Sequence, residues 1–269
     1  MPKCRACNSN EKCHCGCILC QWCNKLYWEH EEFTCNKYMF QAIKPQSKLL
    51  HWYVEQIERR IKLQKPIYLA LVGRDPYPNK PIGIPFAKED MSSQKKCDSG
   101  YVLLWALGIH FFPTRFHSVK KLYKVLLENG IVFLNISYKF LGEIFSKAHT
   151  IHYLKCANLV NKSILDYVQN NNGSILLLGE DTAKGICWAN NEVFHSKKPV
   201  SISLYRQSAV QICHPSGVGD ATWKKVWGGK QGCLLSVIAN NGKRNVVKNA
   251  ISSVNAKLPA NIGPIPPSK

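Results

Sequence analysis

Short apolar runs that alternate with helical patterns are the feature that most constrains how this chain can fold. Each run has about the length of a β-strand. The four runs occupy residues 67–72, 131–136, 174–178 and 209–213. Helical periodicity is found in residues 48–63, 99–109, 118–128, 153–169 and 181–189. Strands separated by helices indicate a parallel sheet covered on both faces. We therefore predict an α/β fold, with three α/β/α layers around a central, mainly parallel four-stranded sheet.

The chain is also strongly basic. It holds 36 Lys and Arg against 17 Asp and Glu, which gives a formal net charge of +19. This excess favours a polyanionic partner, either nucleic acid or an anionic membrane surface. The longest apolar stretch, residues 101–112, is too short to span a bilayer, and residues 1–23 lack the apolar core of a secretory signal. We expect a protein that is neither membrane-bound nor secreted, located in the cytoplasm or, in a eukaryote, the nucleus.

Eight of the thirteen cysteines lie before residue 36 and mark a separate segment. Cys4 with Cys7, and Cys20 with Cys23, form two Cys-x2-Cys pairs, which is the spacing of zinc-ribbon knuckles. Further candidate ligands are Cys13, Cys15, Cys17, His30 and Cys35. We expect structural zinc, with an iron–sulfur cluster as the alternative, because the sequence does not assign which ligands pair. The predicted organisation is a Cys-rich module over residues 1–36, an α/β domain over 37–256 and a Pro-rich tail over 257–269.

Polar residues follow three of the predicted strands. Asp75 comes after the first strand, Asn135 ends the second, and His214 follows the fourth. The carboxyl ends of parallel strands meet at one edge of a sheet, where open α/β proteins bind their ligands. We therefore expect a cleft in which a carboxylate, an amide and an imidazole act as base, reader and electrophile, with Tyr77 and Phe86 as aromatic walls. Taken alone, each polar residue also fits a structural role in a turn or at a strand end.

Four segments of the chain resemble, in order, the motifs of the uracil-DNA glycosylase superfamily. They are Gly73-Arg74-Asp75-Pro76-Tyr77-Pro78, Gly83-Ile84-Pro85-Phe86, Leu134-Asn135 and His214-Pro215-Ser216-Gly217-Val218. The resemblance covers roughly residues 67–227 and implies a monofunctional DNA N-glycosylase that flips out a nucleotide. Such an enzyme excises uracil or a modified pyrimidine and leaves an abasic site, as in base-excision repair. It needs no cofactor for catalysis, and we expect a monomer that binds double- or single-stranded DNA.

The resemblance implies a role for each matching residue. Asp75 would orient and deprotonate the water that attacks C1′, and His214 would donate a hydrogen bond to O2 of the leaving base. Asn135 would read the Watson–Crick edge, Phe86 would stack on the base, and Tyr77 would crowd the pyrimidine 5-position. These five side chains form the predicted catalytic and base-binding set, together with Arg74.

Further DNA contacts are expected outside the base pocket. Val218 stands where the family inserts a larger apolar wedge into the vacated stack, and Ser216 belongs to the same loop. Lys224 and Lys225 follow this loop and are candidate phosphate contacts.

The chain departs from the family pattern at three positions. Arg74 replaces a glutamine, Pro78 replaces a histidine, and Gly217 replaces a proline. Arg74 can pair with Asp75 and suppress the base, or reach a phosphate or a polar group on the target base. One alternative is therefore a glycosylase for hydroxymethylated or glycosylated cytosine in viral DNA, acting in antiviral defence. The others are a catalytically inactive DNA-binding protein and a zinc-dependent adaptor.

Overall fold

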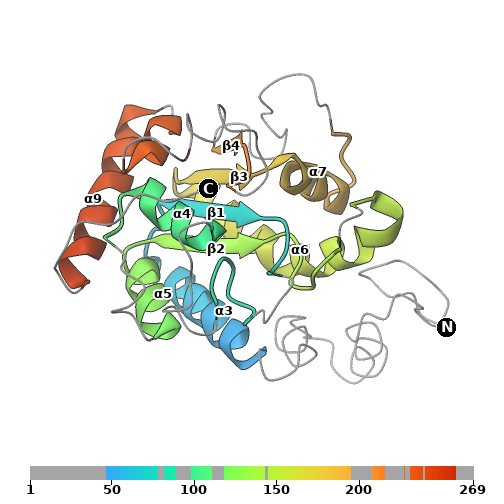
Figure 1. Cartoon of the computed structure of the whole chain (residues 1–269), viewed down its shortest axis with the longest axis horizontal. Helices are drawn as coiled ribbons and strands as arrows, with labels where there is room; N and C mark the ends of the chain where they lie inside the picture. Colours follow the sequence, from blue (N-terminus) through green and yellow to red (C-terminus); the bar gives the residue numbers. More distant parts are fainter. Residues whose placement is uncertain are drawn as a thin grey trace.

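The computed structural model describes residues 47–77, 82–88, 98–110, 118–142, 145–194, 208–215, 227, 231–238 and 240–258. In chain order its elements are α3 (Ser47–Lys62), β1 (Leu69–Gly73), α4 (Ser99–Leu107), α5 (Val119–Glu128), β2 (Ile131–Asn135), α6 (Lys147–Asn170), β3 (Ser174–Leu178), α7 (Glu180–Ala189), β4 (Ala209–Ile212), the 3-10 helix η4 (Cys233–Val237) and α9 (Asn241–Lys257) (Figure 1). Every predicted strand and helix overlaps one of these elements. The predicted Cys-rich module and Pro-rich tail fall outside the described residues, apart from Lys257 and Leu258, so the domain organisation stays a prediction.

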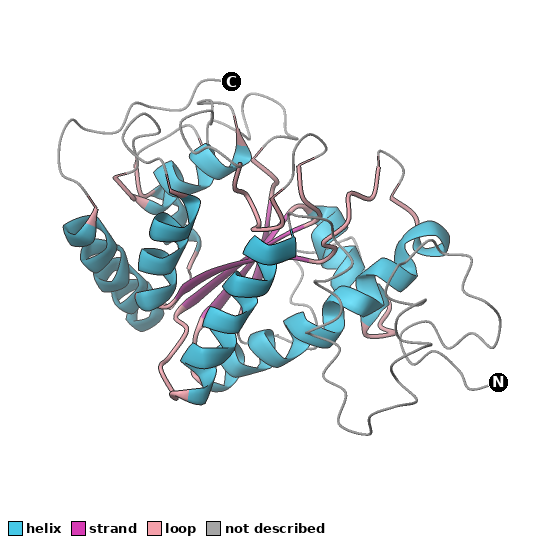
Figure 2. Ribbon diagram, turned by 90° about the horizontal axis from the view of Figure 1, so that it is seen from below, coloured by secondary structure: helices cyan, strands magenta, loops and turns pink. Residues whose placement is uncertain are grey.

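The four strands form one sheet in the order β2-β1-β3-β4. All pairings are parallel. Every residue of β1, β2 and β3 is buried, as expected for a parallel sheet with both faces covered. Figure 2 shows helices on both sides of the sheet. The predicted α/β class with a parallel four-stranded centre is confirmed.

Helices pack against the strands of the sheet and against its β2 edge. α6 packs against β1 and β3, and α7 packs against β3 and β4. At the β2 edge, the Phe133 N–H donates to the Tyr53 hydroxyl of α3 over 2.9 Å. This bond satisfies a backbone donor at the edge of the sheet, where an unpaired strand would otherwise expose it.

α5 illustrates how the local sequence sets a helix. Ser118 is its N-cap, and its side chain accepts a hydrogen bond from the Lys121 N–H over 3.3 Å. Val119, Leu122 and Leu126 are buried, at a spacing that places them on one face of the helix. α5 therefore covers β2, with which it packs directly.

α9 is a helix that the sequence analysis did not assign. Its buried residues Val247, Ala250, Ile251 and Val254 follow the helical period, but polar residues outnumber them, so the apolar stripe is narrow. Asn240 caps its start by accepting from the Lys243 N–H over 3.0 Å. The helix packs against α5 and η4 and closes the end of the molecule far from α7 (Figure 1).

α4 is apolar on all sides, and all nine of its residues are buried. A helix of nine residues is less than half as long as the hydrocarbon core of a bilayer is thick. Among the helices of the described ranges, none combines the length and the apolar character needed to cross a membrane.

Candidate active site

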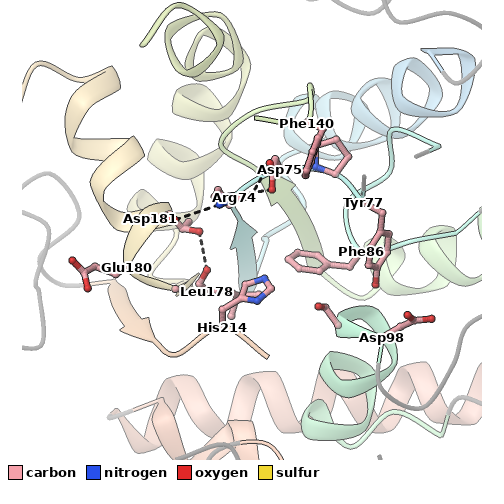
Figure 3. A pocket seen from close by; sticks show the side chains of 14 residues that line it. Arg74, Asp75, Tyr77, Phe86, Asp98, Phe140, Leu178, Glu180, Asp181 and His214 are labelled. Carbon is pink, nitrogen blue, oxygen red and sulfur yellow. Dashed lines mark hydrogen bonds and ion pairs between the residues drawn. The ribbon is translucent and has the colours of Figure 1, made fainter. Parts of the chain in front are cut away.

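The carboxyl ends of the strands border a cleft of about 580 Å³. The strand registers align Gly73 with Asn135 and Leu178 with Ile212, so the segments that follow the strands emerge at one edge of the sheet. The cleft is lined by Arg74, Asp75, Pro76, Tyr77, Phe86, Asp98, Ser99, Phe140, Leu178, Gly179, Glu180, Asp181, Thr182 and His214 (Figure 3). Five of the predicted site residues therefore share this cleft.

Asp75 is held by its neighbours on both carboxylate oxygens. Arg74 Nε donates to Asp75 Oδ1 over 3.0 Å, and Arg74 Nη2 donates to Oδ2 over 3.3 Å. The Leu141 N–H donates to the same Oδ2 over 2.9 Å. The Asp75 side chain is only 9% exposed. A carboxylate accepts about four hydrogen bonds, so these three contacts leave room for about one more within the described chain.

Arg74 is anchored at several points besides Asp75. Its Nη1 donates to Asp181 Oδ2 over 3.4 Å, and its Nη2 donates to the Gly142 carbonyl over 3.1 Å. Its guanidinium carbon lies 5.9 Å from the centroid of the Phe145 ring, which stacks on Trp188. Burial lowers the pKa of Arg74, but the hydrogen bonds and charges of Asp75 and Asp181 outweigh it, and the net effect raises the pKa. The guanidinium stays charged.

His214 lies against the end of β3. Gly179 has a φ of +95°, and a side chain there would bring a Cβ within 3.2 Å of the His214 Cβ. Glycine is the residue that meets both conditions without strain. Burial lowers the pKa of His214 to about 4; the charge of Arg74 acts in the same direction, and Asp181 opposes it. The imidazole is therefore neutral at neutral pH, with one N–H to donate and one nitrogen to accept.

Two aromatic side chains form the opposite wall. The Tyr77 hydroxyl accepts from the Gly100 N–H over 3.0 Å, and Lys88 Nζ lies 5.6 Å from the centroid of its ring. Phe86 is 8% exposed and meets Phe133 edge to face at 6.0 Å. Phe86 also has a φ of +62°, which is uncommon for a residue with a side chain. The predicted aromatic walls are thus present.

Asn135 differs from the expectation that it would line the cleft. It is 1% exposed, and neither polar atom of its side-chain amide has a hydrogen-bond partner in the described part of the chain. The Asn135 amide lies beside Gly73. If residue 73 had a side chain, its Cβ would overlap the Phe86 ring and lie 2.8 Å from Asn135 Oδ1. The absence of a side chain at Gly73 therefore lets Phe86 and Asn135 approach the strand end together. Phe86 reaches the cleft, and Asn135 lies behind its lining.

Asp181 and Phe140 line the cleft but were not assigned a role from the sequence. Asp181 lies in the first turn of α7, and the segment Gly179-Glu180-Asp181 at the end of the third predicted strand was the available signal. No motif marks Phe140. Ser216, Val218, Lys224 and Lys225 lie outside the described residues. The candidate metal ligands Cys4, Cys7, Cys13, Cys15, Cys17, Cys20, Cys23, His30 and Cys35 also lie outside them. Within the described ranges, no group of three or more His, Cys, Asp or Glu side chains is placed to hold a metal ion.

Comparisons with known proteins give one structural similarity. No protein-family model matches the sequence, and no curated protein matches it significantly. A crystal structure of wild-type UNG from Nitratifractor salsuginis is similar over 69% of this chain and 72% of its own, with 13% sequence identity and a TM-score of 0.35. Both values are too low to assign a role to any residue, so the site rests on its own geometry.

Proposed function

We propose that the protein is a DNA glycosylase that hydrolyses the N-glycosidic bond of a pyrimidine nucleotide flipped into the cleft. The observation that carries this proposal is that Asp75 and a neutral His214, far apart in the sequence, line one cleft with Tyr77 and Phe86. A carboxylate and an imidazole donor can catalyse hydrolysis of such a bond, and aromatic walls can stack on the flipped base. The excess of basic residues suits a DNA partner.

Asp75 would act on the water and on the sugar. Its contacts with Arg74 and Leu141 fix the carboxylate and leave about one acceptor position, which would orient a water toward C1′. As the glycosidic bond breaks, the sugar gains positive charge, and the negative carboxylate stabilises it. Asp75 accepts the proton of the water as the oxygen adds to C1′ and later releases this proton to solvent, so the products are a free base and an abasic sugar with a hydroxyl at C1′.

His214 would act on the leaving base. Because its imidazole is neutral, it donates an N–H hydrogen bond to O2 of the pyrimidine, where negative charge develops as the bond breaks. Arg74 lies close enough to influence the pKa of His214, and its positive charge also favours an anionic leaving base. The base then leaves as an anion and takes its proton from solvent.

Asn135 would read the base after a movement of Phe86. The buried amide has a free donor and a free acceptor within the described chain, which suits the Watson–Crick edge of a pyrimidine. Phe86 packs against the same strand end, so a shift of its ring would bring the amide into contact with the cleft. A buried polar group without a partner calls for a functional explanation, and an incoming base supplies one.

The substrate is either uracil or a pyrimidine with a modified 5-position. The hydrogen bonding of Arg74 supports the second candidate, a pyrimidine modified at the 5-position. Its Nε and Nη atoms make four hydrogen bonds to Asp75, Asp181 and Gly142, and a guanidinium has five N–H donors. Within the described part of the chain one donor therefore remains, and it would serve a hydroxyl or glycosyl substituent on cytosine, as in the antiviral alternative. The same Arg74–Asp75 pair would suppress the base in an inactive DNA-binding protein.

Base release distinguishes these candidates. The full-length protein is incubated with matched oligonucleotides that contain uracil, cytosine, 5-hydroxymethylcytosine or glucosylated 5-hydroxymethylcytosine. Free base is identified by mass spectrometry, and abasic sites are detected by alkaline cleavage. We expect release from at least one modified or uracil-containing strand and none from cytosine. Binding without release from any strand would contradict the glycosylase proposal and support the inactive alternative.

The DNA-contacting residues outside the described ranges and the zinc module remain proposals. Elemental analysis of the purified protein tests the module directly. We expect zinc, because two Cys-x2-Cys pairs supply four thiolates. Iron with visible charge-transfer absorption would favour the iron–sulfur alternative.

A further inference from the structure

The segment between β2 and α6 is tied to the candidate catalytic residues. The Ser137 N–H donates to the Arg74 carbonyl over 3.0 Å. Further along, the Leu141 N–H donates to Asp75 Oδ2 and the Gly142 carbonyl accepts from Arg74 Nη2. Residues 137–142 are therefore fixed at both ends to Arg74 and Asp75. A side chain in the middle of this segment has a defined position relative to the catalytic carboxylate.

Phe140 is the side chain that this segment presents at the cleft. It is 40% exposed, lines the cleft, and lies beside Asp75 in Figure 3. The other exposed large hydrophobic residues of the described chain do not line the cleft: they are Leu63, Leu159, Val193 and Val246. Phe86, by contrast, is 8% exposed. The cleft thus has one buried phenylalanine in its wall and one exposed phenylalanine at its rim.

Lys139, which precedes Phe140, is engaged elsewhere. Its Nζ donates to the Tyr153 hydroxyl over 2.8 Å and lies 4.6 Å from the centroid of the Tyr153 ring. These contacts add a third anchor to the segment, on α6. The three anchors restrain the backbone that carries Phe140, so this backbone loses little conformational freedom when a flat ligand stacks on the exposed ring.

We propose that Phe140 stacks on a nucleobase adjacent to the flipped nucleotide. When one nucleotide leaves the duplex, the neighbouring bases lose a stacking partner, and an aromatic side chain can replace it. This inference rests on the proposed function for the existence of a flipped nucleotide, and it adds a DNA contact that no motif of the sequence marks. A nucleobase is favoured over an apolar peptide because the whole chain carries a formal net charge of +19, which suits a polyanionic partner.

The test uses duplexes that contain a reduced abasic site, the non-cleavable analogue of the proposed product, so that binding does not depend on which base is excised. In two versions, 2-aminopurine lies on either side of this site. Affinity is measured by fluorescence anisotropy, and stacking is measured by quenching of the 2-aminopurine emission. The proteins are the wild type, Phe140→Ala, Phe140→Trp and Leu159→Ala, the last as an exposed apolar control away from the cleft.

We expect Phe140→Ala to bind roughly ten-fold more weakly, which corresponds to the loss of one base–aromatic stack. The wild type and Phe140→Trp should quench 2-aminopurine at one of the two positions, and Phe140→Ala should not. Leu159→Ala should behave as the wild type. Equal affinity and equal quenching for Phe140→Ala and the wild type would overturn the inference, as would the absence of DNA binding by the wild type.

The outcome separates this inference from the proposed function. If the wild type releases no base from any strand but Phe140 governs affinity and quenching, the glycosylase proposal fails and the stacking contact stands. If base is released and Phe140→Ala neither weakens binding nor removes quenching, the stacking inference fails and the glycosylase proposal stands.

Discussion

The ends of β1 and β2 lie side by side in register, yet their polar side chains differ in how far they are hydrogen-bonded. After β1, Arg74 and Asp75 border the cleft, and each has several partners. At the end of β2, Asn135 is almost completely buried, and its side-chain amide has no partner within the described chain. One strand end is satisfied before any ligand arrives, and the other is not.

The two strand ends therefore differ in what they contribute to stability. In a largely buried ion pair such as Arg74–Asp75, the cost of desolvation offsets much of the attraction, whereas a buried amide without a hydrogen bond costs about 1–3 kcal/mol. Of the two strand ends, the β2 end therefore carries a polar residue, Asn135, that the stability of the fold does not explain. Asn161 of α6 offers a direct reference, because it is also buried, contacts the Asn135 carbonyl, and has a partner for both polar atoms of its side-chain amide.

Removal of the carboxylate at the β1 end should have the largest effect. Asp75→Asn keeps the size of the side chain but removes the charge and the proton acceptor. We expect base release to fall roughly 1,000-fold, within the range of general-base catalysis, while affinity for the abasic duplex changes little. Single-turnover base release and anisotropy measure the two quantities. Base release at the wild-type rate would show that Asp75 is not the base.

The end of β4 extends the comparison to a titratable group. The pKa of His214 is lowered to about 4 in the folded protein, against about 6.5 in the unfolded chain. The unfolded state therefore binds the proton more readily, so stability is fully present above pH 6.5 and is lost as the pH falls toward 4. The loss attributable to His214 is on the order of 3 kcal/mol.

Denaturant unfolding across this pH window measures the loss, with His214→Gln as the control. The variant should lose less of its free energy of unfolding than the wild type, because the carboxylates titrate in both proteins and only the imidazole differs. An imidazole NMR titration with a midpoint near 6.5 for His214 would contradict the buried, neutral assignment.

The two buried asparagines sharpen the comparison at the β2 end. Asn135→Leu removes two polar atoms that have no partner among the described residues, so we expect the free energy of unfolding to rise by about 1 kcal/mol while base release falls. Asn161→Leu removes the bond from the Tyr138 hydroxyl and the bond to the Asn135 carbonyl, so it should destabilise by about 2 kcal/mol. Chemical denaturation compares them. Equal destabilisation by both substitutions would mean that Asn135 is satisfied in solution.

The smallest effect is expected at Arg74. Arg74→Gln restores the residue that the resembling motif carries and removes the ion pair with Asp75. We expect the ratio of release rates to shift toward uracil, relative to modified cytosine, by roughly five-fold, the equivalent of about 1 kcal/mol. Parallel rate measurements on the two strands give this ratio for both proteins. An unchanged ratio would remove Arg74 from substrate selection.

Local patterns in the sequence were sufficient to predict the strands, most of the helices and the α/β class. A buried strand needs a short apolar run, and a helix such as α5 needs a cap and a periodic apolar face, and these signals lie within a few residues of one another. The positions of Asp75 and His214 after parallel strands were enough to predict that both line one cleft. α9 was not assigned because its four buried residues are diluted by polar ones.

Sequence by itself therefore determined the type of fold and which residues follow the strand ends. Only the tertiary structure decided how those residues are partnered: that Arg74 joins Asp75 to Asp181 on α7, that Phe140 remains exposed at the rim, and that Asn135 lies behind Phe86. The physical reason is that partnering and burial depend on atoms from distant segments. Arg74 and Asp181 are separated by 107 positions in the chain, and no local pattern encodes the distance between their side chains.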